Sequence, residues 1–373
     1  KENEMSAFAI YKLPHDRKAT LMVQRQRDAV TSADLSLLNG ESGFLLSPFM
    51  PSREEPCVLI DADECHTVDI DQLGSADWLR RLEQLEPCLH ACGTIEDEDG
   101  REAYHKAFSR CYEALCEGRV EKVVLARTNF EPLRGHTPCE MFLQACRDYP
   151  RMFVALVSTP VSGTWLMASP EVLIQGNHTP TLPTEESWCG ASFSTMALAG
   201  TMKLEGEQLK FDNPDRSGVQ DIRWSQKNIQ EQRLVATYIA DKLKDFADGI
   251  TEQGPYTTRA ANLVHLRSDF TFQPRQGVSI GDVAAALHPT PAVCGLPKEE
   301  ARKLLLESES AKRHFYSGFC GPLNVGGLTK LFVSLRCMEI GSDGCRLYAG
   351  GGLLKDSVEE QEWQETEAKM MTM

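Results

Sequence analysis

The sequence predicts one large α+β domain, and three observations support this. Segments rich in β-branched and aromatic residues are interspersed with segments of helical periodicity. The 373 residues contain no short repeat, low-complexity tract or Pro-rich linker at which the chain would divide. With 42% hydrophobic and 25% charged residues, the composition is that of a globular protein with a large core. We therefore expect residues 1–373 to form a single domain.

The first third of the chain predicts strands and then helices. Residues 8–60 contain short strand-like segments separated by turn-rich stretches, the clearest being FAIYKL, TLMVQRQ and CVLIDA. Helical periodicity follows at 74–86 and 101–117. From Val120 the sequence becomes rich in strand formers, in the segments VEKVVLARTNF, MFVALVS and TWLMASP.

The last part of the chain predicts two helices with strands between them. A long helix is expected from about Ser217 to Phe246, with an apolar stripe that includes Trp224 and Leu243. Two strand-rich stretches follow, LFVSLRCMEI and CRLYAGGG, and a closing helix starts near Val358. This mixture of strands and helices predicts the α+β class.

Charge and cysteine content limit the possible partners and compartment. There are 39 basic and 54 acidic residues, so the net charge of -15 repels nucleic acid and anionic membranes. An anionic substrate would need locally placed cations. The 13 cysteines are scattered singly, which favours reduced thiols and a cytoplasmic location.

Membrane and export signals are not expected either. No apolar run approaches the ~18 residues of a membrane span, and Lys1 to Ala9 lack the pattern of a signal peptide. Because the first residue is Lys rather than Met, we expect the start of the chain to have been trimmed.

The closing helix places charged residues on one face. Glu362, Glu365 and Lys369 lie at positions i, i+3 and i+7. One interpretation is a solvated face with pairing between Glu365 and Lys369. The alternative is a carboxylate pair that holds Mg²⁺. Since Mg²⁺ takes one or two protein carboxylates, Glu231 of the long helix could supply one of them if the two helices converge.

Two further residues are candidates for proton transfer. Lys122 lies within an apolar strand, where desolvation would make it a general base, although a lysine whose ammonium reaches solvent is the alternative. Glu171 follows a proline turn at the head of an apolar strand. It would donate a proton if buried, and would simply be an exposed strand end otherwise.

Glycine and cysteine motifs give weaker signals. Gly350 to Gly352 and Gly200-Thr201 offer backbone N–H groups to an anion, but they could also be tight turns or bulges. Neither is a P-loop, so nucleotide binding is not expected. The Cys88-x-His90-x-Cys92 segment has zinc-binding residue types without a recognised spacing, and packed cysteines are the preferred interpretation.

Taken in order, these segments resemble the chorismate-utilising enzyme family, in its isochorismate synthase branch. The resemblance covers about residues 100–373, whereas residues 1–95 contribute no comparable motif. It rests on ten segments: VEKVVLAR, SPEVLI, LAGT, KNIQEQ, VHLRSDF, LHPTPAVCGLP, FYSGFCG, SLRC, YAGGG and EWQETEAK. It implies two antiparallel sheets packed orthogonally between helices, with the N-terminal strands completing the sheets.

The resemblance also implies a role for each candidate residue. Lys122 resembles the general base that activates water for attack at C2 of chorismate, and Glu171 the general acid that protonates the departing C4 hydroxyl. Glu231 and Glu365 resemble Mg²⁺ ligands, with Glu362 close by. The remaining substrate contacts that it implies are Gly200, Thr201, His265 and Lys369 near the ring, and Tyr316, Arg336 and Gly350 at the enolpyruvyl carboxylate.

Particular residues indicate the reaction branch. Lys122 fits a water-using enzyme, so no glutamine amidotransferase subunit is expected. Ala199 stands where aminodeoxychorismate synthases carry a lysine nucleophile, and Ala292 resembles isochorismate rather than salicylate synthases. The product would serve menaquinone or siderophore biosynthesis. The pattern makes no prediction of oligomeric state.

Three positions depart from the family pattern. Asn228, Gln232 and Met202 stand where an acidic residue, His and Arg are more common. These departures keep open a non-catalytic chorismate-binding paralogue. Among the enzymes, the alternative is a salicylate synthase, which would release pyruvate.

Overall fold

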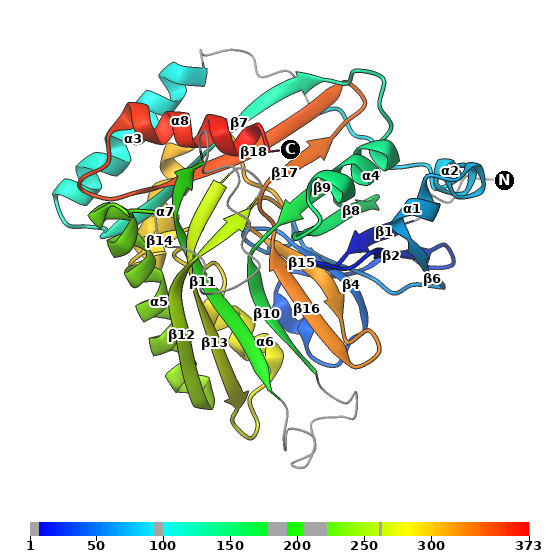
Figure 1. The fold of residues 1–373 in the computed structure, drawn as a ribbon, viewed down its shortest axis with the longest axis horizontal. Helices are drawn as coiled ribbons and strands as arrows, with labels where there is room; N and C mark the ends of the chain where they lie inside the picture. The colour runs from blue at the N-terminus through cyan, green and yellow to red at the C-terminus, as the bar shows by residue number, and fades with distance from the viewer. Residues whose placement is uncertain (1–6, 93–99, 178–191, 205–221, 261–262, 373) are drawn as a thin grey trace.

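The protein is described by a computed structural model at residues 7–92, 100–177, 192–204, 222–260 and 263–372. Within these residues the chain forms two nine-stranded sheets whose paired strands run antiparallel (Figure 1). Sheet A contains, in spatial order, β14 (Gly295–Leu296), β7 (Lys122–Pro132), β18 (Gly344–Leu353), β17 (Cys337–Ile340), β9 (Gly163–Ser169), β8 (Phe153–Thr159), β1 (Ala7–Lys12), β2 (Lys18–Gln24) and β6 (Glu64–Asp69). Sheet B contains β12 (Ala247–Ala260), β13 (Leu263–Pro274), β11 (Phe193–Lys203), β10 (Val172–Asn177), β16 (Leu328–Val333), β15 (Phe319–Leu323), β4 (Gly43–Ser47), β5 (Cys57–Ile60) and β3 (Val30–Ser32).

Helices lie on the outer faces of both sheets. The α5 helix packs against β11, β12 and β13 of sheet B, and α8 packs against β18 of sheet A. The helices are α1 (Ile70–Leu73), α2 (Ala76–Glu83), α3 (Gly100–Cys116), α4 (Pro138–Asp148), α5 (Gln226–Phe246), α6 (Ile280–Leu287), α7 (Lys298–Ser308) and α8 (Glu359–Met370), with a 3-10 turn at Leu35–Leu38. None of the described helices is long and apolar enough to cross a membrane.

The inner core lies between the two sheets. Phe153 of β8 and Phe332 of β16 stack there with ring centroids 4.2 Å apart, so the two sheets are in direct contact. Separate apolar clusters join sheet A to α4 and sheet B to α5 and α6. The layers are therefore helix, sheet, sheet and helix, which confirms the α+β prediction. The orthogonal angle between the sheets stays a prediction.

The long helix begins later than its apolar pattern predicts. Its first residue is Gln226, because the side chain of Ser225 caps the helix by accepting a hydrogen bond from the N–H of Asn228. Trp224 consequently lies outside the helix and donates a hydrogen bond to Thr257 instead. The predicted start at Ser217 lies outside the described residues.

The stretch LFVSLRCMEI is divided between the two sheets. Its first part belongs to β16 of sheet B and its last part to β17 of sheet A. Arg336, between them, has a left-handed backbone with φ of +45°. This turn transfers the chain from one sheet to the other and places Arg336 where the sheets meet.

Candidate active site

A cavity of about 660 Å³, its open mouth included, lies between the sheets where α5 and α8 approach each other. Nine of the twelve site residues expected from the sequence line it: Glu171, Gly200, Thr201, Glu231, His265, Tyr316, Arg336, Gly350 and Lys369. The other three, Lys122, Glu362 and Glu365, contact these residues or lie beside them. The structure therefore brings all twelve together.

Lys122 is completely buried at the start of β7. Its Nζ lies 3.1 Å from Oε1 of Glu231, which projects from α5. The alternative in which the ammonium reaches solvent is therefore wrong. Burial opposes a charge on Glu231, but Lys122 and Lys227 outweigh it and lower the pKa of this carboxyl. The pair joins sheet A to the helix that covers sheet B.

Glu171 precedes β10 and is 2% exposed. Burial raises the pKa of its carboxyl from 4.5 to about 8, although the positive charges of Lys122 and Lys369 act in the opposite direction. An exposed strand end, the alternative weighed above, is thus wrong. At neutral pH this carboxyl is protonated and can donate a proton into the cavity.

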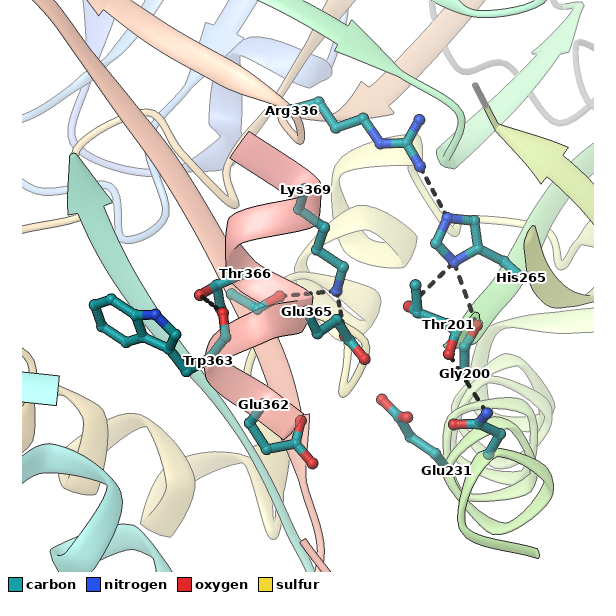
Figure 2. Close-up of polar contacts among 12 residues, drawn as sticks. Gly200, Thr201, Glu231, His265, Arg336, Glu362, Trp363, Glu365, Thr366 and Lys369 are labelled. Atoms are coloured by element: carbon teal, nitrogen blue, oxygen red, sulfur yellow. Dashed lines mark hydrogen bonds and ion pairs between the residues drawn. The ribbon is translucent and has the colours of Figure 1, made fainter. Parts of the chain in front are cut away.

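The closing helix directs Glu362 and Glu365 inward, whereas Glu360 and Glu367 are exposed. The Lys369 ammonium donates to Glu365 Oε1 and to the carbonyl oxygen of Gly350, at 2.7 and 2.8 Å. Glu362 is 2% exposed and pairs with Lys227 of α5. Burial and the neighbouring charge of Glu365 raise the pKa of Glu362. Figure 2 shows Glu231 and Glu365 pointing toward the same space from two helices.

The glycine run of β18 allows these carboxylates to approach the strand. A Cβ at Gly352 would lie 2.1 Å from Oε1 of Glu231, and one at Gly351 would lie 3.3 Å from Oε2 of Glu362. A Cβ at Gly350 would lie 2.9 Å from the Tyr316 hydroxyl. The run is therefore a regular strand without side chains, rather than the tight turn considered as an alternative.

His265 and Arg336 form a buried pair on the other side of the cavity (Figure 2). His265 Nε2 lies 2.9 Å from Arg336 Nη2, and its Nδ1 lies 3.3 Å from the Gly200 carbonyl oxygen. Because guanidinium only donates, His265 must accept at Nε2 and donate at Nδ1. Burial and Arg336 hold the pKa of His265 well below its usual value, so the ring is neutral.

The guanidinium of Arg336 has no carboxylate partner among the described residues. It is 6% exposed, and burial lowers its pKa from 12.5 to about 10. Its other hydrogen bond goes to the Met152 sulfur at 3.5 Å. A buried cation that faces a cavity without a counter-ion is suited to bind an anionic group.

Gly200 forms a bulge in β11 beside this pair. The register with β13 shifts between Ala199 and Thr201, and Gly200 has φ of +73°. A Cβ there would lie 3.0 Å from the backbone oxygen of Asn228, so glycine lets the strand approach α5. The bulge brings the Thr201 hydroxyl to 3.3 Å from His265 Nδ1.

Sequence patterns missed a buried ion pair behind the site. Arg313 donates to both Glu309 and the carbonyl oxygens of Val124 and Val293, two residues that line the cavity. Glu309 in turn accepts a hydrogen bond from the Ala126 N–H at 2.8 Å. Glu309 and Arg313 are four residues apart, a spacing that can indicate an ion pair on a helix. Because α7 ends at Ser308, helical periodicity did not predict this pair.

A second missed contact reaches the site from the N-terminal strand. Lys12 is 1% exposed and donates to the carbonyl oxygens of Pro150 and Met152, at 3.0 and 2.8 Å. The Met152 sulfur accepts from Arg336. Residues before 95 thus support the site without lining it.

Within the described ranges, no three His, Cys, Asp or Glu side chains lie close enough to chelate a metal by themselves. The Cys88 sulfur and His90 Nε2 are 3.2 Å apart, but Cys92 contacts backbone oxygens instead, so the zinc alternative gains no support. The twelve described cysteines form no disulfide among themselves.

Comparison with known proteins identifies the family. A sequence model of chorismate-binding enzymes matches residues 62–373, most of the chain. The chain belongs to the chorismate-binding enzyme family. The enzyme is 30% identical over 307 residues to isochorismate synthase DhbC of Bacillus subtilis (strain 168), a match that covers 80% of this chain and 72% of the relative.

Two further relatives agree with this result. The chain is 35% identical over 342 residues to isochorismate synthase 2, chloroplastic, of Arabidopsis thaliana, covering 89% of this chain but only 56% of that protein. Its fold is similar to that of MenF, the menaquinone-specific isochorismate synthase of Escherichia coli, with a TM-score of 0.72 and 21% identity. That alignment covers 99% of this chain and 88% of MenF.

Proposed function

We propose that this enzyme converts chorismate to isochorismate, with Mg²⁺ as its cofactor. The observation that carries the proposal is the arrangement of a buried lysine and a protonated glutamate around one cavity, which also holds a buried arginine with no carboxylate partner among the described residues. The isochorismate synthases among its relatives support the same reaction.

Substrate binding follows from the positions of the cations. Chorismate is a dianion, and the net charge of the protein would repel it without local cations. We assign the enolpyruvyl carboxylate to Arg336, with the Tyr316 hydroxyl and the Gly350 backbone beside it. The ring carboxylate is assigned to the end where Lys369 and Thr201 lie, with neutral His265 beside the ring.

Two proton transfers on opposite sides of the ring complete the reaction. Lys122 takes a proton from the water whose oxygen bonds to C2. Both ring double bonds shift as the C4–O bond breaks, and Glu171 gives its proton to the departing hydroxyl, which leaves as water. One water enters and one leaves, so the reaction is an isomerisation.

The donor set fits Mg²⁺ if two carboxylates bind it directly. Glu231 and Glu365 supply oxygen ligands from two helices, and the buried Oε2 of Glu362 lacks a hydrogen-bond partner among the described residues. We propose that Glu231 and Glu365 hold the metal, with Glu362 bound through water. The ion would neutralise the ring carboxylate next to the reacting carbons.

The three departures from the family pattern do not reach the cavity. Asn228, Gln232 and Met202 are all absent from its lining. Gln232 donates to the Ala197 carbonyl oxygen at 3.2 Å and so joins α5 to sheet B. This arrangement favours an active enzyme over a non-catalytic paralogue.

We further propose a cytoplasmic location and a product used for menaquinone or siderophore biosynthesis.

The test is an incubation of purified enzyme with chorismate, with and without Mg²⁺. Isochorismate and pyruvate are quantified separately by chromatography, and Lys122→Ala serves as the inactive comparison. We expect Mg²⁺-dependent isochorismate without pyruvate. Salicylate with pyruvate would assign the salicylate synthase reaction instead. Saturable chorismate binding without any product would refute catalysis.

A further inference from the structure

Each carboxylate proposed as a metal ligand is paired with a lysine. Two of these lysines, Lys122 and Lys369, have roles in the proposed reaction. The third, Lys227 in the first turn of α5, has none. It is separated from its partner, Glu362 of α8, by 135 positions in the chain. Lys227 therefore joins α5 to α8 at the carboxylates without a part in the proposed proton transfers or substrate contacts.

Lys227 occupies one side of the carboxylate cluster. It contacts Oε1 of Glu362, and its side chain is only 21% exposed. The other oxygen, Oε2, faces the space above Gly351, which Glu365 Oε1 also borders. The charge of Lys227 acts on Glu231 and Glu365 as well as on Glu362. One ammonium thus reduces the repulsion among three carboxylates.

A divalent cation bound among the same carboxylates would also reduce the repulsion among them. Two cations close together in a partly desolvated site repel each other, so each one weakens the binding of the other. We propose that Lys227 is a built-in counter-cation that competes with Mg²⁺ for this cluster. It holds the metal-free site together and lowers the affinity for the metal. This inference rests on the metal site of the proposed function.

Direct metal binding tests the inference without any measurement of turnover. Mg²⁺ is titrated calorimetrically into the wild-type protein, Lys227→Met and the control Lys244→Met. Lys244 lies on the same helix and pairs with Asp241 at 2.7 Å on the surface, so its variant makes the same chemical change away from the site. We expect Lys227→Met to bind Mg²⁺ about tenfold more tightly, and Lys244→Met to match wild type.

Thermal unfolding supplies a second readout. In EDTA, Lys227→Met should have a lower Tm than wild type, and saturating Mg²⁺ should raise its Tm by more than it raises the wild-type value. A variant that merely damages the fold would not gain metal affinity. Lys227→Gln, titrated in the same way, covers the case in which the methionine variant does not fold.

The outcomes separate this inference from the proposed function. Unchanged or weaker Mg²⁺ binding by both Lys227 variants, with clear binding by wild type, would overturn the inference alone. Wild-type protein without saturable Mg²⁺ binding would overturn the metal assignment itself. In a Glu362→Gln background, adding Lys227→Met should no longer increase affinity, because the competition acts mainly through that carboxylate.

Discussion

The buried carboxyl of Glu171 makes the stability of the folded protein depend on pH. In the unfolded chain this group titrates near 4.5, whereas burial raises the folded-state pKa to about 8. Between these values the unfolded state releases a proton that the folded state keeps. The contribution of Glu171 to stability is therefore fully present below about pH 4.5, and is lost as the pH rises toward 8.

The size of the effect follows from the pH interval. Each pH unit within this window lowers the free energy of unfolding by about 1.4 kcal/mol. From pH 5.5 to 7.5 the protein therefore loses about 2.7 kcal/mol of stability. The assay is urea unfolding, followed by tryptophan fluorescence in EDTA without chorismate, for wild type and Glu171→Gln. The amide does not titrate, so the difference between the two proteins isolates the glutamate from every other group.

We expect the wild type to lose stability relative to Glu171→Gln by that amount over this range. A difference that stays constant with pH would refute the raised pKa and, with it, the assignment of Glu171 as a proton donor. A difference that is constant over this range and changes only below about pH 4.5 would mean that the carboxyl is held charged by Lys122 and Lys369, whose charges favour that form.

Three other predictions concern the cavity. Lys122→Ala should lower kcat by about 10²- to 10⁴-fold while chorismate binding, measured by fluorescence titration, is retained; weaker binding alone would contradict its role as base. Arg336→Met should weaken chorismate binding by about 10- to 100-fold in equilibrium dialysis, because a charged hydrogen bond is lost; unchanged affinity would place the enolpyruvyl carboxylate elsewhere. Gly352→Ala should lower the Tm and bind Mg²⁺ more weakly by calorimetry, because its Cβ displaces the Glu231 carboxylate from its buried pair with Lys122; wild-type affinity in the folded variant would exclude that carboxylate as a ligand.

Local patterns predicted much of the fold and the residue types of the site. The segment VEKVVLAR predicted a strand, which is present, but it left open whether Lys122 is buried or reaches solvent, and the structure buries it. The spacing of Glu365 and Lys369 predicted their ion pair correctly. What the pattern could not determine is which way that helix face points, because an exposed face and one that covers a cavity have the same spacing.

Contacts between distant segments escaped prediction for a physical reason. Periodicity describes one element at a time, whereas the partner of Lys227 lies on α8 and that of Lys12 lies before β8. The sequence did not predict that the chain passes from one sheet to the other at Arg336, because the residues on both sides of it favour strands. The left-handed backbone of Arg336 separates the two strands in the structure.

The two groups proposed to transfer protons belong to different sheets: Lys122 begins a strand of sheet A, and Glu171 precedes a strand of sheet B. Their separation is therefore fixed by how thick the apolar layer between the sheets is, and the stacked rings of Phe153 and Phe332 lie in that layer. A smaller or larger side chain at either ring would change the distance between base and acid without touching the cavity. Core residues that do not line the cavity would then act as spacers between the proposed base and the proposed acid.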